Sequence, residues 1–357
     1  MVPQRSAFVR PPPATTVEAL LRPLVRTADD ARAFELAPGA WCLALPLPYP
    51  RLRSVNCYLL ELDDGLCLVD CGSYLPPGWD GLAHALGLVG RRPEDIRLLV
   101  CTHLHQDHAG LASLIAERTG CDMARAAGPK TAHDALRDRG LPLARRRELV
   151  AREGVPAELL DPMCDAIVAG DGDHPRAHFD RELDASDAIE SRSGTWQVVP
   201  LPGHSPAQIG LFEPQRRWLL SADLVFEGAI PYVEFGAAAD PLADHIASLD
   251  RALALGAERL LPGHGRPVDG GDVVRERLTA ARATAVDLVQ IARDALADGE
   301  CTAYEVSLRL DGEDPHLDWR QSALSIAVCT LEHLLTTGDA IASVGSDGVR
   351  RWRPRST

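Results

Sequence analysis

The sequence predicts an α/β fold whose strands end at turns that carry metal-binding side chains. The apolar run 96–101, broken only by Arg97, is typical of a buried strand, and a helix-like pattern follows over 109–118. Three later apolar runs each end at a turn with a histidine or an aspartate. With 357 residues, of which 46% are hydrophobic, the chain can form one large domain with an appendage.

The densest of these turns follows the strand at 96–101. Within six positions it places three histidines and one aspartate, which are His103, His105, Asp107 and His108. Neutral imidazole and carboxylate are the groups that hold zinc and similar divalent ions. Lone histidines are more often surface or core residues, and histidine tracts also occur as tags, but this tract is neither terminal nor a homopolymer. We therefore interpret it as part of a metal site.

Three later turns supply further ligand candidates. Leu-Pro-Gly-His ends at His204, Leu-Leu-Ser-Ala-Asp ends at Asp223, and Leu-Pro-Gly-His occurs again with its end at His264. Gly203 and Gly263 allow the backbone to turn sharply just before each histidine. One Pro-Gly-His turn is a weak signal, but two such turns and the turn at Asp223, in this order behind the first cluster, predict a complete site.

These motifs resemble the metallo-β-lactamase-fold hydrolase superfamily over about residues 40–270. The resemblance includes an expected strand pair at 55–60 and 66–72. It implies an αββα sandwich of two mixed sheets, in which the aspartate matching Asp70 supports the metal ligands through hydrogen bonds. An aspartate two residues before Gly72 also suits the start of a turn, and the two roles are compatible.

The resemblance further implies two divalent metal ions that share one carboxylate. The ligands divide as His103, His105 and His204 for one ion, Asp107, His108 and His264 for the other, and Asp223 for both. Zinc is the first candidate metal, with manganese or iron as alternatives. A hydroxide bridging the ions would attack the substrate, and Asp107 is the candidate catalytic residue that accepts or relays a proton.

Features of the same turns favour one branch of the superfamily. Asp223 stands where true β-lactamases usually have cysteine or another residue, and His105 and His108 differ from the acidic ligands of flavodiiron proteins. The stretch from Asp223 to His264 is too short for the extra domain of many nucleases. The branches that remain compatible with the sequence are glyoxalase-II-like thioesterases, lactonases and simple endoribonucleases. The segment after His204 lacks the second Gly-His of many thioesterases, which argues against a close relation to glyoxalase II.

We therefore expect a dinuclear metal-dependent hydrolase that cleaves a small acyl substrate, a thioester or ester first and a lactone next. The alternative is a metal-dependent endoribonuclease or phosphodiesterase, in which the same hydroxide attacks phosphorus. The formal net charge of −14 argues against a broad nucleic-acid surface, which needs basic side chains to neutralise phosphates.

The expected domains are an N-terminal extension at 1–35, a catalytic domain at 36–270 and a C-terminal domain at 271–357. Within the catalytic domain, helical patterns at about 128–170 predict an insertion beside the metal site, including helices at 131–139, 143–153 and 156–166. Its apolar side chains either line an acyl-binding pocket or pack the insertion onto the core. They are Leu149, Val150, Val155, Leu159, Leu160, Met163 and Ile167.

Three helices and a hairpin are predicted in the C-terminal domain, at 272–298, 302–310, 319–336 and 339–352. Their order resembles a small winged-helix domain, which some endoribonucleases and thioesterases of the superfamily carry. The third helix holds one arginine, Arg320, besides His333, whereas a DNA-recognition helix normally carries several basic residues. We expect a packing module, a homodimer contact or a wall of the active-site mouth.

Cysteine usage and hydropathy predict a cytoplasmic protein. The nine cysteines are scattered without a C-x-x-C pair, which is typical of free thiols in a reducing compartment. The sequence has no apolar run of about 18 residues, and its first residues lack the apolar stretch of a secretory signal. We therefore expect no membrane partner.

Overall fold

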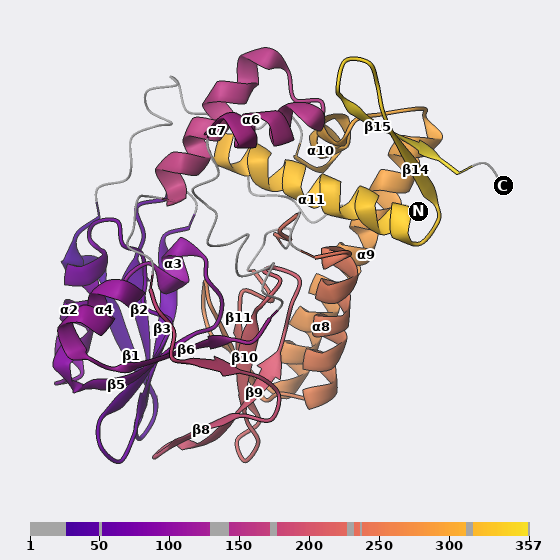
Figure 1. Cartoon of the computed structure of the whole chain (residues 1–357). Coiled ribbons are helices and arrows are strands. Elements are labelled where there is room, and N and C mark those ends of the chain that lie inside the picture. The colour runs from indigo at the N-terminus through magenta and orange to yellow at the C-terminus, as the bar shows by residue number, and fades with distance from the viewer. Residues whose placement is uncertain are drawn as a thin grey trace.

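In the computed structural model, two β-sheets pack face to face and helices cover both outer faces (Figure 1). The structure describes residues 26–49, 52–128, 143–171, 177–226, 232–235, 238–311 and 317–355. Side chains at 143–146, 166–171, 311 and 317–319 lie outside the described set. The arrangement is the αββα sandwich of two mixed sheets that the sequence predicts.

The first sheet has seven strands in the order β1 to β7. Neighbours from β1 to β4 are antiparallel, and neighbours from β4 to β7 are parallel. The strands are β1 Arg32–Ala37, β2 Ala40–Pro46, β3 Ser54–Glu61, β4 Leu66–Val69, β5 Ile96–Cys101, β6 Asp122–Ala126 and β7 Arg181–Leu183. Because Arg32 of β1 pairs with Ala44, the sheet includes the last residues of the segment assigned to the N-terminal extension.

Helices cover the outer face of this sheet. They are η1 Ala28–Asp30, α2 Gly78–Leu88, η2 Pro93–Asp95, α3 Gln106–Ala109 and α4 Ala112–Thr119. Leu82 of α2 and Ile115 of α4 are buried in one core with Leu43 and Leu68 of the sheet. The helix expected at 109–118 corresponds to α4, which begins at Ala112, while the preceding α3 overlaps it only at Ala109.

The second sheet has six strands in the order β13, β12, β11, β10, β9, β8, and only β11 and β12 are parallel neighbours. The strands are β8 Ala188–Ser191, β9 Gly194–Pro200, β10 Ile209–Glu213, β11 Trp218–Ala222, β12 Arg259–Pro262 and β13 Val268–Asp269. Tyr58 and Val69 of the first sheet share a core with Trp196 and Leu211 of the second. The outer face of the second sheet is covered by α8, Pro241–Leu255, and by the start of α9, Gly271–Ala297.

The C-terminal elements follow the predicted order. After α9 come α10 Ala303–Asp311, α11 Leu317–Thr336 and the hairpin of β14 Ala340–Val344 and β15 Arg350–Pro354. The long helix α9 serves two cores, because Leu278 packs against the second sheet while Leu288 and Leu296 pack among the C-terminal helices. The winged-helix likeness of this domain stays a prediction.

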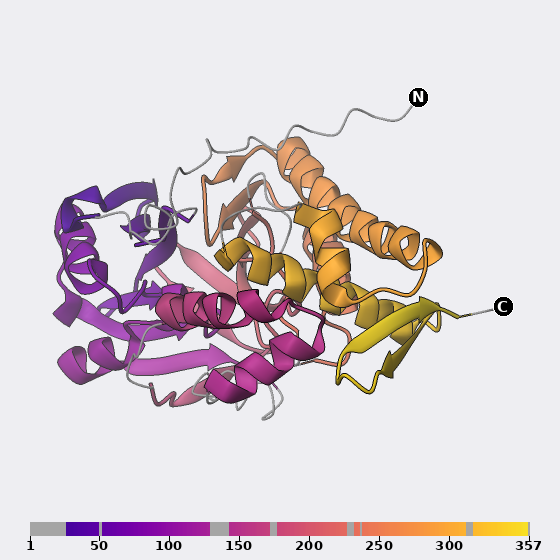
Figure 2. The same cartoon turned by 90° about the horizontal axis from the view of Figure 1, so that it is seen from above.

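The insertion packs against the C-terminal domain. Its helix α7 Ala157–Asp171 lies beside α11, and α6 Leu143–Arg152 packs against α7 (Figure 2). Val150 and Met163 are buried in one core with Leu288 of α9 and Leu331 of α11. Packing thus accounts for these two apolar positions, whereas the helix expected at 131–139 and the side chain of Ile167 lie outside the described residues.

All nine cysteines are free and buried, as expected. Burial raises the pKa of the Cys42 thiol and of the Cys67 thiol to about 12, so both stay protonated at neutral pH. Among the described residues, no helix combines the length and the apolar character that a membrane span needs.

Met163→Ala should lower the free energy of unfolding by about 2–5 kcal/mol, because it leaves a cavity between the insertion and the C-terminal helices. Urea unfolding followed by tryptophan fluorescence measures the change. Val286→Ala, at an exposed position of α9, is the matched control and should change it by less than about 0.5 kcal/mol. Equal effects of the two substitutions would contradict the packing of α7.

Candidate metal centre

The seven predicted ligands meet at one edge of the sandwich because each follows a strand that ends there. His103 and His105 lie in the loop after β5, and Asp107 and His108 lie in α3. His204 follows β9, Asp223 comes directly after β11, and His264 lies two residues after β12, the parallel neighbour of β11. All seven belong to groups of three residues whose ligand atoms lie within 4.8 Å of one another.

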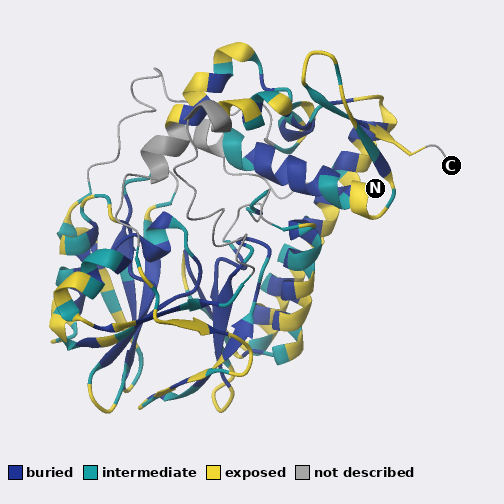
Figure 3. Cartoon of the chain, in the orientation of Figure 1, coloured by how far each residue is buried: buried dark blue, intermediate teal, exposed yellow. Residues whose placement is uncertain are grey.

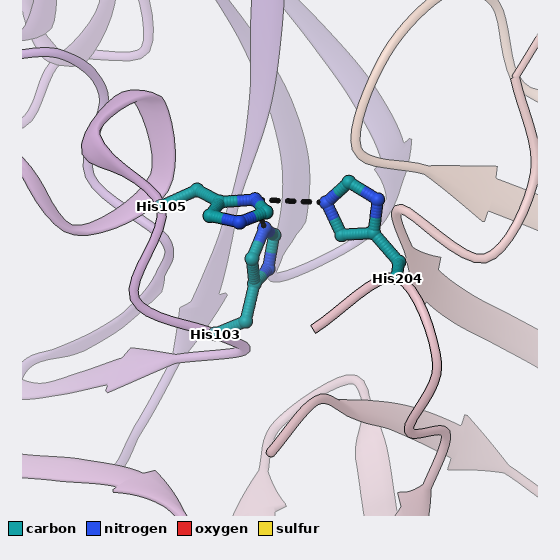
Figure 4. A group of neighbouring side chains, drawn as sticks. All are labelled: His103, His105 and His204. Carbon is teal, nitrogen blue, oxygen red and sulfur yellow. Dashed lines mark hydrogen bonds between the residues drawn. The ribbon is translucent and has the colours of Figure 1, made fainter. Parts of the chain in front are cut away.

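His103, His105 and His204 form the first group, shown in Figure 4. Nδ1 of His105 lies 3.0 Å from Nε2 of His103 and 2.8 Å from Nε2 of His204. Three ring nitrogens therefore face one point from two different strand ends. His103 and His204 are buried, so these nitrogens have little access to water.

Asp107, His108 and His264 form the second group. Nε2 of His264 lies 3.2 Å from Oδ2 of Asp107 and 3.3 Å from Nε2 of His108. Asp223 contacts both groups, since its Oδ2 lies 3.3 Å from Nε2 of His264 and 3.4 Å from Nε2 of His204. Asp223 therefore lies between the two groups, and its role as a bridging ligand stays a prediction.

Outward hydrogen bonds fix which nitrogen of each ring faces the centre. Nδ1 of His264 bonds the carbonyl of Ser54 at 2.8 Å, and Nδ1 of His204 bonds the carbonyl of Tyr232 at 3.1 Å. A carbonyl can only accept, so each Nδ1 donates a proton to its carbonyl and each Nε2 is the nitrogen that faces the centre. His105 has the opposite orientation, because its Nε2 faces the Glu234 carboxylate at 3.4 Å and its Nδ1 faces inward.

Asp70 organises the first cluster, as the resemblance implies. Its Oδ2 accepts from Nδ1 of His108 at 2.7 Å and from the hydroxyl of Thr102 at 2.8 Å, and its Oδ1 accepts from the Thr102 amide at 2.7 Å. The Thr102 hydroxyl in turn lies 3.0 Å from Nδ1 of His103. Asp70 adopts a left-handed backbone with a φ of 58°, which places its carboxylate beneath the cluster and is rare for a residue other than glycine.

Burial and contacts between the side chains determine which groups of the centre are charged. Burial and the neighbouring histidines lower the pKa of His103 well below its usual range, and burial lowers the pKa of His204 to about 3. Burial also lowers the pKa of His264, but Asp223 and Asp107 outweigh it and raise that pKa to about 10. His103 and His204 are therefore neutral imidazoles at neutral pH, whereas the second group contains carboxylates that hold a positive charge on His264.

The donor set fits divalent cations. Oδ1 of Asp223 is buried and accepts no hydrogen bond from the described residues, although it lies 3.3 Å from Nε2 of His108. The backbone at Gly263 passes so close that a Cβ there would collide with this oxygen. A desolvated carboxylate among imidazole nitrogens is the kind of donor set that zinc and related ions bind.

Comparison with known proteins decides the family. A model of the metallo-beta-lactamase superfamily matches residues 50–264, a span that contains all seven predicted ligands. The chain belongs to this superfamily. The superfamily and the geometry together support a metal-dependent hydrolase.

Individual relatives agree with this assignment. The chain is 26% identical over 281 residues to the probable metallo-hydrolase YqjP of Bacillus subtilis, covering 75% of this chain and 84% of the relative. It is 27% identical over 237 residues to a linear primary-alkylsulfatase of Pseudomonas, covering 63% of this chain but 44% of that protein.

Two solved structures of superfamily proteins share the fold across most of the chain. A metallo-beta-lactamase family protein from Thermus thermophilus superposes with a TM-score of 0.75 and 27% identity, covering 90% of this chain and 100% of that one. A beta-lactamase domain protein from Burkholderia ambifaria gives a TM-score of 0.77 and 26% identity, covering 90% and 94%.

Several residues that support the centre were missed in the sequence. Asn56 donates to the carbonyls of Pro262 and Gly265 at 2.9 Å, and the Tyr58 hydroxyl donates to the Pro262 carbonyl at 2.7 Å. Both side chains are buried in β3 and tie the first sheet to the turn that carries His264. In the sequence, a single asparagine inside an otherwise apolar strand could have indicated that Asn56 makes buried hydrogen bonds.

Asp223→Ala should abolish binding of at least one of two metal ions together with hydrolysis, because Asp223 contacts both histidine groups. Metal content by inductively coupled plasma mass spectrometry and turnover of the best substrate measure the two effects. Asp80→Ala, on the exposed face of α2, is the matched control. Full retention of metal and activity would contradict the central role of Asp223.

Asp70→Asn should weaken metal binding by about 10- to 100-fold, because an amide accepts more weakly from His108 and Thr102. Competition with a chromophoric chelator measures the affinity, and circular dichroism checks the fold. Asp80→Asn provides the control. Unchanged affinity would show that the hydrogen bonds of Asp70 do not orient the ligands.

Proposed function

We propose that this protein is a dinuclear metal-dependent hydrolase of a small acyl substrate, a thioester or ester first and a lactone next. The observation that carries the proposal is the convergence of ligand atoms from seven side chains, in which Asp223 groups with His103 and His108 and also contacts His204 and His264. Divalent ions bound there would act as Lewis acids and would lower the pKa of a water toward neutrality, which makes hydroxide available at neutral pH.

The side chains divide their roles by group. His103, His105 and His204 would hold one ion, Asp107, His108 and His264 would hold the other, and Asp223 would contact both. Imidazole and carboxylate oxygen suit zinc first, with manganese or iron as alternatives. The outward hydrogen bonds keep the imidazoles in the tautomers that present a lone pair to the ions.

Asp107 is the proposed proton acceptor. Burial raises the pKa of its carboxyl, but the neighbouring His108 and His264 outweigh burial and hold that pKa well below its usual range. Asp107 is therefore ionised at neutral pH, and its side chain keeps 14% exposure, more than the 4% of Asp223. It can accept a proton from an incoming water, although a carboxylate of such low pKa is a weak base.

The burial and the charge pairing of the C-terminal domain favour a small-molecule substrate over a nucleic acid. Helix α11 is buried along most of its described length (Figure 3), so it offers little surface to a DNA or RNA groove. Two arginines of the hairpin are neutralised within the chain, since Arg350 pairs with Glu153 and Glu332, and Arg351 pairs with Asp347. The buried free thiols are consistent with the proposed cytoplasmic location.

A second candidate is hydrolysis of a sulfate ester. The identity to the linear primary-alkylsulfatase of Pseudomonas favours it, although the match spans 44% of that protein. The same hydroxide could attack a sulfate ester, so an alkyl sulfate belongs among the substrates tested.

Purified protein loaded with zinc should hydrolyse acyl-CoA thioesters or p-nitrophenyl esters, with homoserine lactones next. The panel also contains an alkyl sulfate, a phosphodiester and single-stranded RNA, and product formation is measured for each substrate. Treatment with a chelator should abolish turnover, and added zinc should restore it. Turnover confined to the phosphodiester and RNA would refute the proposal, and turnover confined to the alkyl sulfate would establish the second candidate.

A further inference from the structure

The short segment 232–235 joins the metal centre to the C-terminal domain. It lies between β11 and α8, and it has no regular secondary structure. Val233 is completely buried in the core that the C-terminal helices share with the insertion. The two residues beside it, Tyr232 and Glu234, both contact ligands of the first histidine group.

On the side of the C-terminal domain, one serine of α11 anchors the segment. The hydroxyl of Ser325 donates to the carbonyl of Val233 at 2.7 Å and accepts from the amide of Phe235 at 3.3 Å. One turn further along α11, Sγ of Cys329 lies 3.6 Å from the same carbonyl. Ser325 is buried, so water cannot readily replace the bonds that it makes.

On the side of the metal centre, the segment holds two rings of one group. The Tyr232 carbonyl accepts from Nδ1 of His204 at 3.1 Å, and Oε2 of Glu234 lies 3.4 Å from Nε2 of His105. In the second group, His108 and His264 make their outward bonds to Asp70 and Ser54 of the first sheet. His103 of the first group also faces the first sheet, through the hydroxyl of Thr102. His105 and His204 are therefore the two rings that a different part of the molecule orients.

We propose that α11 positions His105 and His204, two of the three rings of the first group, through this segment, with Glu234 as the positioning residue for His105. A carboxylate that accepts from Nε2–H fixes the tautomer in which Nδ1 of His105 is free, and it makes that nitrogen a stronger donor to a metal. Tyr232 has the same effect on His204 through its backbone. The inference rests on the proposed metal centre, and it assigns the C-terminal domain a role in metal binding.

Glu234→Ala should weaken the binding of one of two zinc ions by about 10- to 100-fold and leave the other unchanged. Glu234→Gln should recover part of the affinity, because the amide oxygen still accepts from Nε2 of His105 but is less basic. Chelator competition measures both affinities. The visible spectrum of the cobalt-substituted protein should change only for the ion bound by the three-histidine group, a signature that a general loss of stability would not produce.

Ser325→Ala tests the anchor, and Thr330→Val is its matched control on the same helix. Thr330 is also buried, but its hydroxyl donates to the carbonyl of Ile326 within α11. Ser325→Ala should weaken the binding of the same ion as Glu234→Ala, whereas Thr330→Val should leave both affinities unchanged. If α11 acts through Glu234, the double substitution Ser325→Ala with Glu234→Ala should lose less affinity than the sum of the two single effects.

The outcomes separate this inference from the proposed function. If the unaltered protein binds no divalent ion, the proposed function fails. If it binds two ions and both Glu234 variants keep both affinities and the cobalt spectrum, only the positioning role is overturned. Equal effects of Ser325→Ala and Thr330→Val on metal affinity would overturn the role of α11. If Ser325→Ala does not fold, the metal affinities of the Glu234 variants still test the positioning role of Glu234.

Discussion

The rest of this structure depends on one constraint. Carboxylates and imidazoles are buried, away from water, at the edge where the two sheets meet. Asp70, His108 and Asp223 are almost completely buried, and an unpaired buried charge costs several kcal/mol. Each group must therefore face an opposite charge, a hydrogen-bond partner or a metal ion. The surrounding contacts satisfy the outward atoms and leave a set of inward atoms whose charge and softness suit divalent cations.

The sandwich supplies the rigidity that such a centre needs. Ligands arrive from both sheets, so their separation depends on how the sheets are held against each other. Asn56 and Tyr58 of β3 bond the backbone just before His264, and Asp70 joins Thr102 to His108 across the ends of β4 and β5. These bonds lie inside the core between the sheets, where the low dielectric strengthens them.

The C-terminal domain is integrated with the rest of the chain rather than appended to it. Helix α9 packs against the second sheet at one end and against α10 and α11 at the other. The insertion shares a core with α11, and Arg350 of the hairpin pairs with Glu153, the residue that follows α6. Through Ser325, the same helix also contacts the segment that orients His105 and His204.

By itself, the sequence determined the strands that lead to the ligands and the seven residues that meet at the centre, because strand patterns and turn chemistry are local properties. The motifs at these turns also carried the resemblance to the superfamily. Only the tertiary structure decided which partner orients each ring. The Ser54 carbonyl reaches His264 from the other sheet, and Glu234 reaches His105 from a loop held by α11. Backbone carbonyls leave no mark in the sequence, and such pairings between distant segments follow from how the layers pack.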